Sequence, residues 1–146
     1  MIYRIEKEKK SAEHLLFASM KYTKTCDVMI NLLHTWRSMI ELCVEAILER
    51  AKKKKLIKVI PEAPRARLEV VELISKKSPV VMKTMIFYLF LRRIDSLEQI
   101  RRSEFRKNVT LEIIDGDKIT EINMDKIKEW YELTEEFLKE VRVYIK

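Results

Sequence analysis

The residues with the clearest capacity for chemistry are basic. They form three adjacent pairs in the second half of the chain, Arg92-Arg93, Arg101-Arg102 and Arg106-Lys107. Arginine can hold a phosphate through two parallel hydrogen bonds, which lysine cannot do. These six residues are therefore our candidates for binding nucleic acid, RNA in particular. A further basic block spans residues 52–55.

Two features of the sequence weigh against that use of the arginines. No aromatic residues interleave with them as a platform for stacking bases would require. The acidic residues Asp95, Glu98 and Glu104 lie close by in the sequence. We therefore favour intramolecular ion pairing or simple solvation for these arginines. Nucleic-acid binding is the alternative.

The residues that could support catalysis or hold a metal are few and scattered. The two histidines, His14 and His34, lack the i, i+4 pairing of a helical zinc site. Cys26 and Cys43 form no CxxC motif, so we predict buried free thiols. The carboxylates at positions 41, 45 and 49 are typical of a solvated helix face. We predict no catalytic residue, no metal site and no cofactor; an enzyme with an unrecognised pocket is a further alternative.

The single glycine, Gly116, excludes several nucleotide-binding loops. A P-loop or a dinucleotide-binding loop needs two or three glycines at fixed offsets. Gly116 lies within Asp115-Gly116-Asp117, between two short runs that contain apolar residues. This arrangement predicts one small β-hairpin near residues 109–122.

The remaining elements that must position these residues are helices. Apolar spacing predicts helices over residues 3–24, 26–55 and 64–76, another from 79, and a last one after 123. Thr25, Ser78 and Asn123 are the expected N-caps. The spacing of Ser96 and Gln99 is that of a capping box, which predicts that the helix from 79 kinks or restarts near Asp95. Otherwise the helix continues to about Arg106. The expected fold is mainly α, an antiparallel four- or five-helix bundle with one hairpin, in a single domain over 1–146.

The segment 80–91 is apolar on nearly all sides, which predicts a central helix or a subunit interface. From the second possibility we predict a homodimer, with candidate interface residues Val81, Met85, Tyr88 and Leu89. The aromatic residues have the spacing of core positions, and we predict that they pack in the core rather than forming a ligand cage. They are Trp36, Phe87, Phe90, Trp130, Tyr131 and Phe137.

Composition narrows the class of protein further. Residues 108–146 carry 10 acidic and 6 basic side chains, although the whole chain has a formal charge of +7. An acidic last third can partly neutralise the basic remainder, which weakens the prediction of a surface that binds nucleic acid everywhere. The abundance of Lys and Glu resembles that of thermophile proteins. No segment is long enough to cross a membrane and the first residues lack a signal-peptide core, so we expect a cytoplasmic protein.

The first two predicted helices also carry a family resemblance. Residues 12–18 read Ala-Glu-His-Leu-Leu-Phe-Ala, and a long helix with small and apolar residues follows, including Trp36 to Leu48. Over residues 3–57 this pattern resembles the HEPN group of helical-bundle proteins. The resemblance implies a dimeric up-and-down bundle that accompanies a nucleotidyltransferase or acts as a ribonuclease.

The ribonuclease branch of that group uses an arginine followed by a histidine four to six residues later. No histidine follows Arg101, Arg102 or Arg106 here. The resemblance therefore implies no ribonuclease activity for this chain. The function we favour from the sequence is a non-catalytic helical interaction protein that forms a homodimer, as a companion of a nucleotidyltransferase in the family interpretation.

Overall fold

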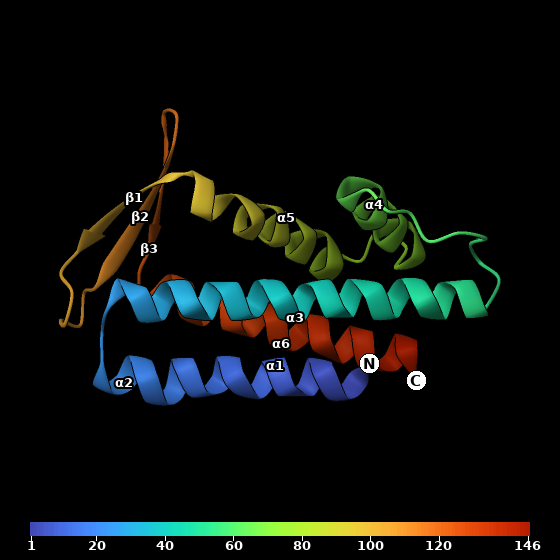
Figure 1. Cartoon of the computed structure of the whole chain (residues 1–146), viewed down its shortest axis with the longest axis horizontal. Helices are drawn as coiled ribbons and strands as arrows, with labels where there is room; N and C mark the ends of the chain where they lie inside the picture. The colour runs from blue at the N-terminus through green and yellow to red at the C-terminus, as the bar shows by residue number, and fades with distance from the viewer.

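The computed structural model describes all residues 1–146, and it is mainly helical with a small antiparallel sheet at one end (Figure 1). The helices are α1 (Ile2–His14), α2 (Met20–Tyr22), α3 (Cys26–Lys53), α4 (Pro64–Ile74), α5 (Pro79–Arg93) and α6 (Met124–Ile145). A π-helical turn, η1 (Leu15–Ser19), joins α1 to α2, and a 3₁₀ turn, η2 (Ile94–Ser96), follows α5. The strands are β1 (Glu98–Arg102), β2 (Thr110–Asp115) and β3 (Lys118–Ile122).

Side-chain caps begin the three helices for which the sequence predicts them. The Thr25 hydroxyl accepts the backbone N–H of Val28, and the Asn123 amide oxygen accepts that of Lys126. The Ser78 hydroxyl does the same at α5, where Pro79 occupies the first turn. Each cap satisfies a backbone donor that has no partner within its own helix.

Helix α3 occupies the centre of the molecule. It contacts α1, α4, α5 and α6, and Figure 1 shows it running along the length of the structure between α1 and α5. Trp36 on this helix is buried against Phe87 of α5, which in turn stacks on Trp130 of α6. The buried apolar residues form a cluster of 33 that extends from Ile5 to Val141. None of the helices combines the length and the hydropathy needed to cross a bilayer.

The prediction for the end of α5 is wrong. The helix neither kinks or restarts near Asp95 to form a further helix nor continues to 106, because the chain turns at η2 and enters β1. The Ser96 hydroxyl donates to the Arg93 carbonyl, and the Gln99 amide donates to that of Ile94. The pair that resembles a capping box therefore satisfies carbonyls at the end of one helix instead of N–H groups at the start of another.

The predicted hairpin is present, but the sheet has three strands in the order β1-β2-β3. The turn between β2 and β3 contains Gly116 with φ of +61°, a conformation that glycine adopts without steric cost. Leu111 lies opposite Ile122, and both are buried against the helices. This packing supports a sheet that would be marginal in isolation.

Candidate nucleic-acid interface

The structure separates the basic pairs that the sequence places on one helix. Arg92 and Arg93 end α5, Arg101 and Arg102 lie in β1, and the pair 106–107 lies in the loop between β1 and β2. Several of these side chains form ion pairs within the chain, as favoured from the sequence. Arg93 binds Asp115 at 2.8 Å, Arg101 binds Asp27 at 2.7 Å, and Arg102 binds Glu112 at 2.6 Å.

Arg106 and Lys107 remain exposed and belong to none of the ion pairs in the structure. Their loop lies against the connection between α2 and α3. The backbone N–H of Phe105 donates to the Lys24 carbonyl at 2.6 Å. Segments about eighty residues apart in the sequence therefore meet at one end of the molecule, at the left of Figure 1.

Side-chain contacts fix the position of this loop on the start of α3. The Glu104 carboxylate accepts the backbone N–H of Cys26 at 2.9 Å, which adds an acceptor at the N-terminus of that helix. Arg101 reaches Asp27 and also lies 3.7 Å from Glu104. The hydrogen bond from Arg101 holds the pKa of the Asp27 carboxyl below its usual range, so this carboxylate keeps its charge to a lower pH than a free aspartate does.

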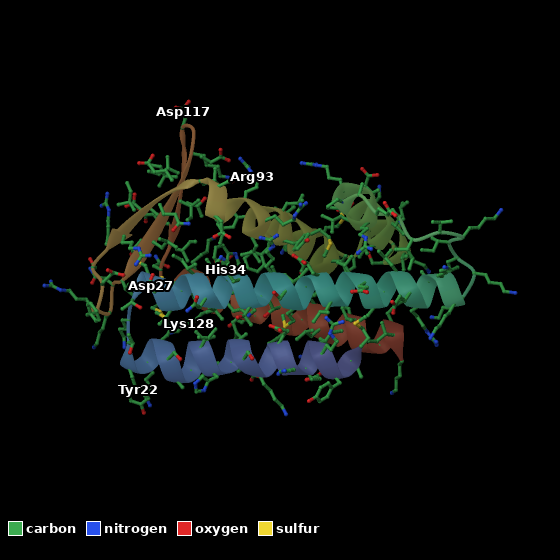
Figure 2. The ribbon with its side chains drawn as sticks, viewed as in Figure 1. Tyr22, Asp27, His34, Arg93, Asp117 and Lys128 are labelled. Atoms are coloured by element: carbon green, nitrogen blue, oxygen red, sulfur yellow. The ribbon has the colours of Figure 1, made fainter.

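Aromatic rings point outward from the same end. Tyr22, the last residue of α2, is 81% exposed, and Figure 2 shows it directed away from the body of the molecule. Phe105 is 75% exposed, and it lies at a positive φ of +68°, as does Ser103 two residues earlier at +54°. For side chains other than glycine such backbone costs about 1–2 kcal/mol per residue. The strained turn thus presents an apolar ring to solvent.

A third ring lies on the π-helical turn η1. Phe17 is 56% exposed and meets Tyr131 of α6 edge to face, with ring centroids 5.2 Å apart. The backbone N–H of Met20 donates to the Leu15 carbonyl, which is the wider i to i−5 bond of a π-helix. Such turns are rare and occur frequently at functional sites.

Cations lie near the Phe17 and Tyr22 rings. Lys21, Lys24 and Lys128 line a hollow of about 410 Å³ whose apolar wall includes Phe17 and Tyr131. None of the three lysines belongs to an ion pair in the structure. We call this surface the aromatic–basic end. It consists of Phe17, Lys21, Tyr22, Lys24, Phe105, Arg106, Lys107, Lys128 and Tyr131.

Sequence reasoning found only Arg106 and Lys107 of this surface. The rings could not be identified in this way, because Phe17 and Tyr22 lie far from Arg106 in the sequence and their spacing is that of an ordinary helix. Phe105, directly before Arg106, is a signal that could have been used. The statement that no aromatic residues accompany the basic clusters is therefore wrong for this cluster.

Other polar groups form less complete sites. The His34 ring nitrogen Nε2 lies 2.8 Å from the Asp95 carboxylate, but no hydroxyl or thiol hydrogen-bonds to the ring. Arg92 lines a polar cleft of about 270 Å³ with Arg37, Arg67 and three glutamates. Both cysteines are free and buried, as predicted. No group of three or more His, Cys, Asp or Glu side chains is placed to hold a metal ion.

Three of the predicted interface residues face the chain's own core. Val81, Met85 and Tyr88 are buried against neighbouring helices, and Leu89 is partly buried against the same core. These side chains are therefore covered within their own chain. This burial corrects the prediction that this face of α5 forms a subunit interface. The exposed apolar side chain on α5 is Ile86, on a different face.

No family model, curated protein or solved structure matches the chain.

Proposed function

We propose that this chain is a non-catalytic protein that binds single-stranded nucleic acid, RNA in the first instance, through its aromatic–basic end. Its helices act as an antiparallel bundle that supports this surface. One observation carries the proposal: solvent-exposed rings and cations without ion-pair partners gather at the end of the molecule where the α2–α3 connection meets the loop between β1 and β2. Phosphates attract the cations, and unstacked bases can stack on the rings.

The rings favour a single strand over a duplex. In a duplex the base faces are already stacked on one another, so an exposed ring has no face to bind. Tyr22 projects from the C-terminal end of α2, and Phe105 projects from the loop between β1 and β2. The unpaired lysines would also repel a second copy of the same surface.

Fluorescence anisotropy with a labelled oligouridine at low salt tests the proposal. Replacing one stacking ring, in Tyr22→Ala or Phe105→Ala, should weaken binding by about 5- to 150-fold, since stacking on an aromatic side chain contributes about 1–3 kcal/mol per base. Tyr3→Ala is the matched control, because Tyr3 is equally exposed but belongs to the start of α1.

The same assay with other ligands distinguishes the class of molecule that the surface binds. Equal affinity for oligothymidine and oligouridine would show that the surface binds single-stranded DNA and RNA alike. A preference for duplex DNA would contradict the stacking role of the rings. Binding to vesicles of anionic lipid with none to oligonucleotides would replace the proposal with a membrane-surface role. Unchanged affinity in both ring variants would refute it.

A further inference from the structure

The loop that follows α3 carries a basic block that lies outside the aromatic–basic end. Figure 1 shows the end of α3 and this loop at one extreme of the long axis of the molecule, beyond the ends of α1 and α6. We call residues 52–60 the lysine tip, and its exposed basic residues are Lys52, Lys53, Lys54, Lys55 and Lys58. None of them belongs to an ion pair in the structure, although Lys54 lies over the Tyr144 ring, 4.6 Å from its centroid. Glu49 and Glu62 are the nearest acidic residues in the sequence, so the tip carries five positive charges and no negative one.

The apolar side chains of the lysine tip divide between the core and solvent. Ile57 and Ile60 pack against the hydrophobic core, so they hold the loop on the molecule. Leu56 and Val59 are instead 61% and 76% exposed. Two aliphatic side chains therefore stand among the lysines, at the most projecting part of the chain, without serving its own packing.

Backbone hydrogen bonds to the last turn of α3 fix the start of the lysine tip. The N–H of Leu56 donates to the Ala51 carbonyl at 2.9 Å, and the N–H of Lys55 donates to the Lys52 carbonyl at 3.0 Å. With the positive φ of Lys55, +61°, these bonds form a Schellman motif, a common way to end a helix. The residue in the position of Leu56 frequently packs back on the helix in this motif. Here the motif leaves Leu56 exposed to solvent.

We propose that the lysine tip docks on a lipid bilayer that contains anionic headgroups, with Leu56 and Val59 entering the boundary between headgroups and acyl chains. Negative headgroups attract each lysine that lies near the surface. The two aliphatic side chains leave water on docking, which adds a hydrophobic contribution. Such a contact lies in the plane of the headgroups and requires no helix that crosses the bilayer.

The aliphatic side chains favour a bilayer over a nucleic acid at this end of the molecule. Lysines alone would attract either polyanion. A base gains little from Leu56 or Val59, because neither side chain offers an aromatic face on which it could stack. An acyl layer can bury both of them.

Docking through the lysine tip leaves the aromatic–basic end free. Helix α3 has 28 residues and is therefore about 42 Å long. It begins beside the loop between β1 and β2, where Glu104 accepts the Cys26 N–H, and it ends at the tip. The two surfaces lie at opposite ends of one helix, so their binding can be tested separately.

Co-sedimentation of the full chain with lipid vesicles tests the proposal. Vesicles with equal parts of phosphatidylserine and phosphatidylcholine should bind the chain, and vesicles of phosphatidylcholine alone should not. Lys52→Ala/Lys55→Ala should weaken binding to the mixed vesicles by about 25-fold, since each lysine near an anionic surface contributes about fivefold. Arg106→Ala/Lys107→Ala removes equal charge from the aromatic–basic end and should leave vesicle binding unchanged.

A second variant separates insertion into a bilayer from simple attraction to a polyanion. Leu56→Ser/Val59→Ser keeps every charge, and it should weaken vesicle binding by at least about tenfold because less apolar surface leaves water. Leu73→Ser is the matched control, since Leu73 is 68% exposed but lies on α4, outside the lysine tip. Circular dichroism should show the same thermal unfolding for all these variants, because the replaced side chains are exposed.

Three results would overturn the proposal. The first is equal vesicle binding by the original chain and the Leu56→Ser/Val59→Ser variant. The second is loss of oligouridine binding in Lys52→Ala/Lys55→Ala with vesicle binding unchanged, which would assign the lysine tip to nucleic acid. The third is no binding to the mixed vesicles at low salt, which would leave the proposed function of the aromatic–basic end intact.

Discussion

The loop residues Arg106 and Lys107 allow a quantitative test of how the aromatic–basic end binds. Five cations there belong to no ion pair in the structure: these two and Lys21, Lys24 and Lys128. If each contacts one phosphate of a single strand, the logarithm of the binding constant should fall with the logarithm of salt with a slope of about −3.5. Raising salt fourfold should then weaken binding by about 130-fold.

The double variant Arg106→Ala/Lys107→Ala removes two of those contacts. Its slope should fall to about −2.1, so the same fourfold rise in salt should weaken binding by only about 20-fold. Anisotropy titrations with oligouridine at several salt concentrations measure both slopes. The matched control is Lys52→Ala/Lys55→Ala, which removes equal charge from the opposite end of α3.

An unchanged slope in the 106/107 variant, together with a reduced slope in the control, would move the binding surface to the basic block at residues 52–55. Binding with no dependence on salt in any variant would exclude phosphate contacts altogether.

Three further predictions concern the elements that hold the structure together. Glu104→Ala should lower the free energy of unfolding by about 1–2 kcal/mol in urea titrations, because the Cys26 N–H loses its acceptor; an unchanged midpoint would contradict that capping role. Arg102→Ala should cost about 2 kcal/mol, because Glu112, only 5% exposed, would lose its partner. Adding Glu112→Gln should recover most of that loss, and no recovery would show that the charge is not the cause. Burial raises the pKa of the Cys43 thiol to about 12, so a disulfide reagent at pH 8 should modify it only as fast as the chain unfolds. Because the pKa of the Cys43 thiol is raised in the folded chain, its contribution to the free energy of unfolding is complete below the unfolded pKa of about 8.5 and is lost as pH rises toward 12. Rapid modification of Cys43 in the native state would contradict its burial.

The helix boundaries show what local sequence determines. Thr25, Ser78 and Asn123 begin α3, α5 and α6 as predicted, because a cap depends on a side chain and backbone only three residues apart. Gly116 marks the turn of the hairpin for an equally local reason. Such features can be predicted from the sequence without knowledge of the tertiary packing.

Strand β1 shows what local sequence leaves open. Its residues, Glu98 to Arg102, have no alternation of apolar and polar side chains, because it is an edge strand with little burial on either face. The strand is held by pairing with β2 and by arginines that reach Asp27 and Glu112. These partners are distant in sequence, so the residues of β1 alone favour a helix.

The aromatic–basic end could be predicted only in part for the same reason. Arg106 and Lys107 stand out by residue type, but Tyr22 joins them through the contact between Phe105 and Lys24. In α5, apolar periodicity identifies a buried helix without showing which of its apolar stripes faces the core. The resemblance of residues 3–57 to the HEPN group and the companion nucleotidyltransferase stay predictions.

Cross-linking tests the proposed function most directly. The intact chain would be irradiated with a single-stranded oligonucleotide that contains 4-thiouridine, and the modified peptides would be identified by mass spectrometry. Our account predicts adducts on the peptides that contain Tyr22 and Phe105, and their loss at high salt. Adducts confined to residues 52–55, or no adducts at low salt, would contradict it.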